Sequence, residues 1–123
     1  MKSVRSIANA SSGIVVGDAS AIIDCTVALN GVEGISIGNA GVVADNLVNG
    51  NTNTGILGGF GNAVVGNALL RNGGPGMNFP TGRASITGYG ENVVHTPPGG
   101  TQQPILQGIS MGGNVCNGTE TCP

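Results

Sequence analysis

The sequence has few aromatic and few charged residues, and both shortages restrict what the chain can be. Phe60, Phe79 and Tyr89 are the only aromatic side chains among 123 residues, and tryptophan is absent. The core must therefore be filled by stacked Val, Ile, Leu and Ala instead of large rings. Charged residues make up 8% of the chain and the net charge is −2. With no basic patch, nucleic acid and anionic membrane surfaces are not expected partners.

Long apolar runs are also missing. Polar residues interrupt the N-terminal segment 1–12, which does not read as a signal peptide, and no apolar stretch is long enough to span a bilayer. We expect one domain without a membrane span. The repeat described next begins part-way through a unit, so either the first unit is a crude cap or the chain is the C-terminal part of a longer solenoid.

One short unit recurs four times in steps of 21 residues, without insertion or deletion. The four copies are Asn9-x-x-x-Gly13-Ile14, Asn30-x-x-x-Gly34-Ile35, Asn51-x-x-x-Gly55-Ile56 and Asn72-x-x-x-Gly76-Met77. A fixed period of this length predicts a solenoid of about four to five stacked coils.

Within each coil, two aliphatic-x-x-Asn units precede one Gly-Ile-x-aliphatic unit, which indicates three short strands joined by three bends. Glycine returns every few positions, at a cost of about 1 kcal/mol each in a helix, and no coil shows helical periodicity. A leucine-rich repeat would need leucine at several fixed places, which this sequence lacks. We therefore predict an all-β fold.

The recurring asparagines have a structural interpretation. In stacked coils an Asn side chain tolerates a bend and can donate a hydrogen bond to its equivalent one coil away, about 4.8 Å distant. The predicted ladders consist of Asn30, Asn51 and Asn72, and of Asn46 with Asn67. A row of sugar-binding amides is the alternative, and we favour the ladders because repeats commonly use stacked polar residues.

The pattern Val43-x-x-Asn46-x-Val48-x-x-Asn51-x-x-x-Gly55-Ile56 resembles the repeat of the pectin-lyase-like superfamily. The resemblance covers residues 1–96. It implies a right-handed parallel β-helix of four to five coils. Two successive prolines, Pro97 and Pro98, end the period, and we expect residues 97–123 to form an irregular C-terminal capping tail. The resemblance does not imply one function, because the architecture serves polysaccharide lyases, hydrolases, adhesins and tailspikes alike.

The residues that would carry an enzymatic activity of that superfamily are not found. The chain has no adjacent Asp pair, and its single histidine, His95, is not in a Gly-His-Gly motif. Asp24 and Asp45 occupy the same position in successive coils, and Gly66 and Thr87 are expected to continue that row. The pair is a candidate calcium site, but two carboxylates supply fewer oxygens than calcium prefers, so we favour a solvated acidic row. Tyr89 and His95 could lie near each other beyond the last coil.

The tail contains an apolar segment and two of the three cysteines. Ile105, Leu106, Ile109 and Met111 are expected to cover the open end of the solenoid, where unpaired strand edges would otherwise aggregate. Cys116 and Cys122 can close a small disulfide around an Asn-Gly turn. A zinc pair is the alternative, although further ligands are missing. Cys25 stands where later coils have asparagine, which indicates a buried free thiol.

These observations favour a non-catalytic extracellular structural or adhesive module, either alone or as part of a longer exported protein. Low charge and positive mean hydropathy favour self-association, and the resemblance to fibre-forming tailspikes implies a trimer. Contact with polysaccharide is an expected further property. The alternative is a carbohydrate-active enzyme, or a fragment of one, acting on a uronate polymer; we expect no cofactor other than the candidate calcium.

Overall fold

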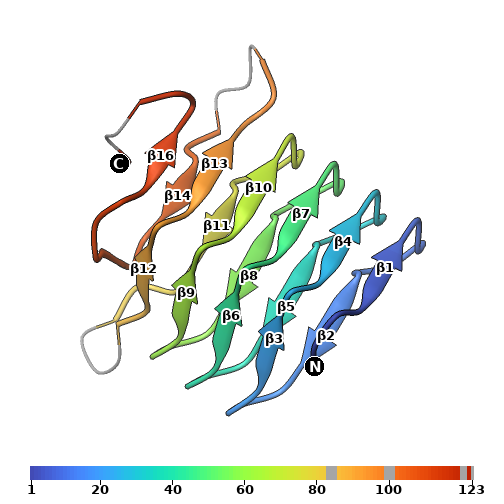
Figure 1. Cartoon of the computed structure of the whole chain (residues 1–123), viewed down its shortest axis with the longest axis horizontal. Helices are drawn as coiled ribbons and strands as arrows, with labels where there is room; N and C mark the ends of the chain where they lie inside the picture. The colour runs from blue at the N-terminus through green and yellow to red at the C-terminus, as the bar shows by residue number, and fades with distance from the viewer. Residues whose placement is uncertain (83–85, 99–101, 120–121, 123) are drawn as a thin grey trace.

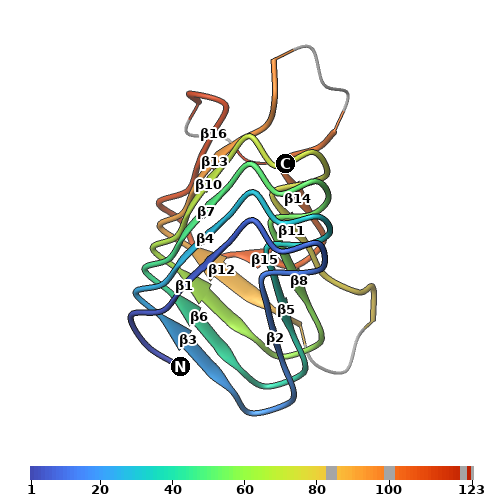
Figure 2. The same cartoon turned by 90° about the vertical axis from the view of Figure 1, so that its right-hand side faces the viewer.

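The computed structural model describes residues 1–82, 86–98, 102–119 and 122. These residues form sixteen short strands, all of which join parallel sheets (Figure 1). Figure 2, which looks along the stack, shows a three-sided cross-section with one sheet on each side. The predicted all-β solenoid of about five coils is thus confirmed.

Each sheet takes one strand from every coil. The sheet called here the β1 sheet consists, in spatial order, of β1 (Arg5–Ile7), β4 (Thr26–Ala28), β7 (Leu47–Asn49), β10 (Ala68–Leu70), β13 (Val93–His95) and β16 (Val115–Cys116). The β2 sheet consists of β2 (Ile14–Val16), β5 (Ile35–Ile37), β8 (Ile56–Gly58), β11 (Met77–Asn78) and β14 (Ile105–Leu106). The β3 sheet consists of β3 (Ala21–Ile23), β6 (Val42–Ala44), β9 (Ala63–Val65), β12 (Gly88–Gly90) and β15 (Ile109–Ser110).

The core is built from columns of aliphatic side chains in strict register. In the β1 and β3 sheets the middle residue of each three-residue strand points inward, as the two-residue periodicity of a strand requires; Val27 pairs with Val48 and Ile22 with Val43, and all four are fully buried. The β2 sheet contributes its first residue to a column composed of Ile14, Ile35, Ile56, Met77 and Ile105.

The sheets continue beyond the region where the sequence period is visible. Strands β14, β15 and β16 lie in the segment 97–123, which we predicted to be an irregular tail, and each adds one strand to a sheet. The period is lost because the connections lengthen. Three residues, 59–61, connect Gly58 with Asn62, whereas seven residues, 80–86, connect Phe79 with Thr87. The strand register is preserved nevertheless, because Tyr89 pairs with Val64.

The C-terminal end of the β1 sheet is closed by its own chain. Cys116 forms a disulfide with Cys122, and its backbone pairs in antiparallel fashion with Thr119 through N···O distances of 2.8 and 3.0 Å. This pairing occupies an edge that could otherwise pair with another chain. Of the residues expected to cover the end, Ile105 is buried, but Ile109 and Met111 are exposed. Met111 instead lies over Gly88 on the outside of the β3 sheet.

The cysteines give a first testable prediction. Cys25 is a buried free thiol and Cys116 and Cys122 are bonded, so a thiol reagent should titrate none of the three cysteines in the native protein. Burial makes the Cys25 thiol inert until the chain opens. We expect one reactive thiol after denaturation and three after denaturation with reductant. Two or more reactive thiols in the native, unreduced protein would contradict the disulfide.

Candidate functional site

Two ladders of asparagine side chains run along the inside of the corners. Asn30 is representative: its backbone N and its Nδ2 both donate to Oδ1 of Asn51, over 3.0 and 2.8 Å, and its Nδ2 also donates to a backbone carbonyl of the preceding coil. The first ladder consists of Asn9, Asn30, Asn51 and Asn72. Every buried side-chain nitrogen and oxygen of the described residues has a hydrogen-bond partner. These amides stabilise the coils by satisfying one another.

The second ladder is longer than the sequence indicated. It runs from Asn46 through Asn67 to Asn92 and Asn114, and Cys25 stands at its start, where its backbone N donates to Asn46 Oδ1 over 2.9 Å. The period reasoning missed the last two members because their spacings are 25 and 22 residues. A local signal was present, since each Asn of this ladder directly precedes a strand of the β1 sheet.

One corner of the solenoid, where each coil passes from the β3 sheet to the β1 sheet, is acidic. Asp24 and Asp45 occupy this corner with left-handed backbone angles, φ +54° and +56°. The row continues through Gly66 to Glu91, which follows β12 as Asp45 follows β6. We expected Thr87 in this row, and that was wrong: Thr87 accepts a hydrogen bond from the backbone N of Asn62 inside the solenoid. We call Asp24, Asp45 and Glu91 the acidic corner.

The carboxylates of the acidic corner differ in their surroundings. Asp24 Oδ2 accepts a hydrogen bond of 2.9 Å from Ser3 Oγ. The side chains of Asp45 and Glu91 have no hydrogen-bond or ion-pair partner among the described residues. Asp45 Oδ1 lies so close to Gly66 of the next coil that any side chain there would collide with it. The Asp45 carboxylate therefore lies between its own coil and the coil of Gly66.

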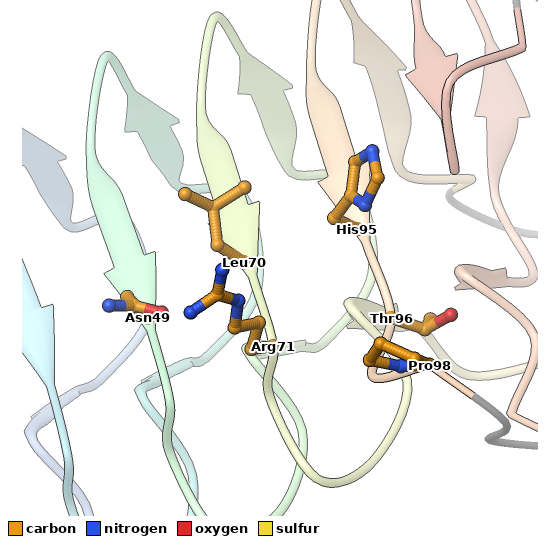
Figure 3. A pocket seen from close by; sticks show the side chains of 6 residues that line it. All are labelled: Asn49, Leu70, Arg71, His95, Thr96 and Pro98. Carbon is orange, nitrogen blue, oxygen red and sulfur yellow. The ribbon is translucent and has the colours of Figure 1, made fainter.

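The opposite corner, where the chain leaves the β1 sheet, is basic and contains a shallow cavity. Arg71 provides its cationic group and His95 an imidazole, and the cavity of about 380 Å³ is lined by Asn49, Leu70, Arg71, His95, Thr96 and Pro98. Figure 3 shows the guanidinium group of Arg71 extending back towards Asn49, with Leu70 and His95 projecting from neighbouring strands. Neither side chain has a hydrogen-bond or ion-pair partner among the described residues. We call Arg71 and His95 the basic corner.

The backbone positions the basic corner firmly. Arg71 adopts φ +52°, a left-handed turn that also follows β1, β4 and β7 in this sheet, and Gly50 does the same one coil earlier with φ +65°. The backbone N of Arg71 donates to the carbonyl of His95 over 2.8 Å. Thr96 is held by Asn117, whose Oδ1 accepts from both its N and its Oγ1. The corner can present positive charge and hydrogen-bond donors to an anionic group.

The structure does not bring Tyr89 and His95 together as a pair of functional side chains. Tyr89 points into the core from β12 and is 3% exposed, whereas His95 is exposed at the end of β13 in another sheet. Gly108 packs close to the rings of Tyr89 and Phe79, where a Cβ would lie 3.1 Å from an atom of each. Tyr89 therefore serves the packing of the last coils.

Burial raises the pKa of the Tyr89 phenol above its ordinary value of 10.0. Because the folded pKa exceeds the unfolded one, the stabilisation is complete below pH 10 and is lost as the pH rises through the folded pKa. We expect the ultraviolet absorbance of tyrosinate, reporting on the only tyrosine, to appear above pH 10 and together with a fall in the free energy of unfolding. Ionisation at the value of the denatured chain while circular dichroism stays native would contradict this.

The calcium candidate gains no further ligand from the fold. In the part of the chain that the structure describes, no three His, Cys, Asp or Glu side chains come together as a metal site.

The same part holds no helix with the length and hydropathy needed to cross a membrane. A comparison with protein-family profiles, curated proteins and solved structures finds no match to this chain.

Proposed function

We propose that the chain is a non-catalytic extracellular structural or adhesive module that associates with itself. The observation that carries this proposal is that the outer faces of the sheets expose aliphatic side chains although the solenoid already has an aliphatic core. Asparagines are buried and hydrogen-bonded inside, while Leu47 and Val93 on the β1 sheet and Val42 on the β3 sheet are each about 40% exposed. Flat sheets that present aliphatic side chains to solvent are suited to contact with another surface.

The repeat pattern supports placing the chain in the pectin-lyase-like superfamily, and by that resemblance the self-associated form would be a trimer. The disulfide between Cys116 and Cys122 supports an oxidising location, which fits an exported protein or a part of one. Contact with polysaccharide would use the basic corner, where Leu70 offers an apolar platform beside the guanidinium group of Arg71. A uronate carboxylate would complement that charge.

The competing function is a carbohydrate-active enzyme acting on a uronate polymer. The experiment is to incubate the purified chain with polygalacturonate and with alginate, with and without calcium, and to follow both the absorbance of unsaturated uronates and new reducing ends. We expect neither signal to exceed that of a heat-denatured control. Product formation that depends on Asp24 or Asp45 would contradict the non-catalytic proposal and favour the enzyme.

Self-association is tested separately by multi-angle light scattering over a wide range of protein concentration. We expect the weight-average mass to exceed 12.0 kDa, the mass of one chain, as concentration rises. A mass that stays at one chain at every concentration would contradict the self-associating module. The limiting mass would also test the trimer that the resemblance implies.

A further inference from the structure

Among the described residues, the outer face of the β1 sheet is the one face with unpaired charges of opposite sign along its two long edges. The acidic corner supplies Asp45 and Glu91 on one side, and the basic corner supplies Arg71 and His95 on the other. Between them lie Leu47, Ala68, Leu70 and Val93, of which Leu47 and Val93 are 40 and 42% exposed. From β7 to β13 the face is an apolar strip with a negative edge and a positive edge, and the exposed Arg5 lies on the first strand, outside this stretch.

The other two faces lack this arrangement. The β3 sheet has the acidic corner on one edge, where Lys2 pairs with Ile23, and Asp18 with Asn39 beyond the other, so its one described cation lies on the acidic side. The β2 sheet is approached by Glu33, whose carboxylate already accepts hydrogen bonds from Ser12 and Asn53. Among the described residues, the β1 sheet is therefore the one whose two edges carry unpaired charges of opposite sign.

We propose that this face is a two-fold interface with a second copy of the same chain, in which the two solenoids lie side by side with their N-termini at the same end. The proposal rests on the self-association proposed above and replaces the trimer that the resemblance implies with a dimer. A two-fold axis parallel to the stack turns the acidic edge of one copy onto the basic edge of the other. An axis across the stack would oppose acid to acid, which is unfavourable.

The coil levels match across such an axis, because a rotation about the stack direction keeps each coil opposite the same coil of its partner. Glu91 precedes β13 and His95 is its last residue, so each faces the other's counterpart at the level of this one strand. Asp45 belongs to the coil of β7, but its carboxylate lies over Gly66, which precedes β10. The guanidinium group of Arg71, which follows β10, extends back towards Asn49 at the end of β7 (Figure 3). The Asp45 and Arg71 side chains therefore approach a common height and are opposite in sign, and Glu91 can accept a hydrogen bond from His95.

The geometry of the face also sets the strength of the contact. Strands in a sheet lie about 4.8 Å apart and residues rise about 3.3 Å along a strand, so six strands with their corners cover roughly 450 Å² on each copy. An interface of this size is at the weak end of specific protein contacts. The expected species is a reversible dimer whose dissociation constant rises with salt, because its charged pairs lie at the rim.

The test compares matched variants by sedimentation equilibrium. Val93 and Val42 are the same residue type with exposures of 42 and 40%, on the β1 and β3 sheets respectively. Val93→Lys should raise the dimer dissociation constant about tenfold or more, whereas Val42→Lys should change it less than about twofold. Circular dichroism melting of each variant confirms that it remains folded.

The charge pairing is tested by a swap. Arg71→Glu should weaken the dimer about tenfold or more, and Asp45→Arg combined with it should restore the constant to within about threefold of the original, because the swapped pair is again complementary. Lys2→Glu changes the net charge by the same amount on an exposed residue that pairs with Ile23 at the start of the β3 sheet. This control should leave the dimer unchanged.

The outcomes separate this proposal from the proposed function. A monomer at every concentration contradicts both. Association that Val42→Lys weakens and Val93→Lys does not, a limiting mass of three chains, or a double swap that fails to restore the dimer contradicts only the two-fold contact through the β1 sheet. If Arg71→Glu associates as the original chain does but no longer binds polygalacturonate, the basic corner binds polysaccharide and does not form the interface. That result would contradict the two-fold contact.

Discussion

Replacing Asn51 by alanine is expected to lower the free energy of unfolding by about 4 kcal/mol. Its Oδ1 accepts the backbone N–H and the Nδ2 of Asn30, and its Nδ2 donates to Asn72 Oδ1 and to the Val27 carbonyl. The substitution leaves the buried backbone N–H of Asn30 without that partner. One buried unsatisfied donor costs about 1–3 kcal/mol, and each further lost hydrogen bond adds about 1 kcal/mol.

Asn53→Ala is the matched control for that substitution. Asn53 lies in the same turn and is exposed, and its side chain donates only to Glu33 Oε1, so its removal should change stability by less than about 0.5 kcal/mol. Urea denaturation followed by circular dichroism measures both variants. If the free energies of unfolding of Asn51→Ala and Asn53→Ala differ by less than about 1 kcal/mol, the ladder does not stabilise the solenoid.

The second large effect is expected at Gly55, one of the glycines that follow the first ladder in each coil. A Cβ at this position would lie 2.6 Å from the carbonyl oxygen of Gly76 and 2.8 Å from Nδ2 of Asn72. The backbone cannot move away easily, because Ile56 N donates to that same carbonyl over 2.8 Å. Gly55→Ala should therefore destabilise the protein by about 3 kcal/mol, the upper range for overpacking.

Gly17→Ala provides the comparison, because a Cβ there would meet no atom within 4 Å. Neither glycine has a positive φ, so the two substitutions differ in space and not in backbone preference. Gly17→Ala should be neutral or slightly stabilising, by up to about 0.5 kcal/mol, through a smaller entropy of the unfolded chain. Equal melting temperatures of the two variants would show that successive coils can move apart to accept the methyl group without loss of stability.

The strict period allowed the sequence to predict most of the first four coils. Aliphatic residues that return after 21 positions form the inward columns, and Asn30, Asn51 and Asn72 lie one above another. The repeat alone was sufficient to predict these columns, because in coils of equal length the same repeat position lies directly above its equivalent in the coil before. Leu29 and Arg71 also share a position, although only the structure shows that it is a left-handed corner.

The candidate site was harder to predict, because it depends on where connections lengthen. Counting in steps of 21 placed Thr87 in the acidic row, whereas the longer connection before β12 places Glu91 there. The basic corner combines Arg71 and His95, which are 24 positions apart in the sequence and adjacent in space. The position of the Asp45 carboxylate over Gly66 is a side-chain property that no repeat pattern contains.

The longer connection between β11 and β12 has a consequence for how such a chain can acquire new surface properties. The segment 80–86 is longer than its counterpart 59–61, yet Tyr89 still pairs with Val64 and Asn92 still accepts from Asn67. A longer connection at a corner therefore leaves the strand pairing and the asparagine ladder unchanged. Foreign loops, such as binding peptides, could be grafted at this corner and displayed at a fixed height on the rod without redesigning the strands that carry them.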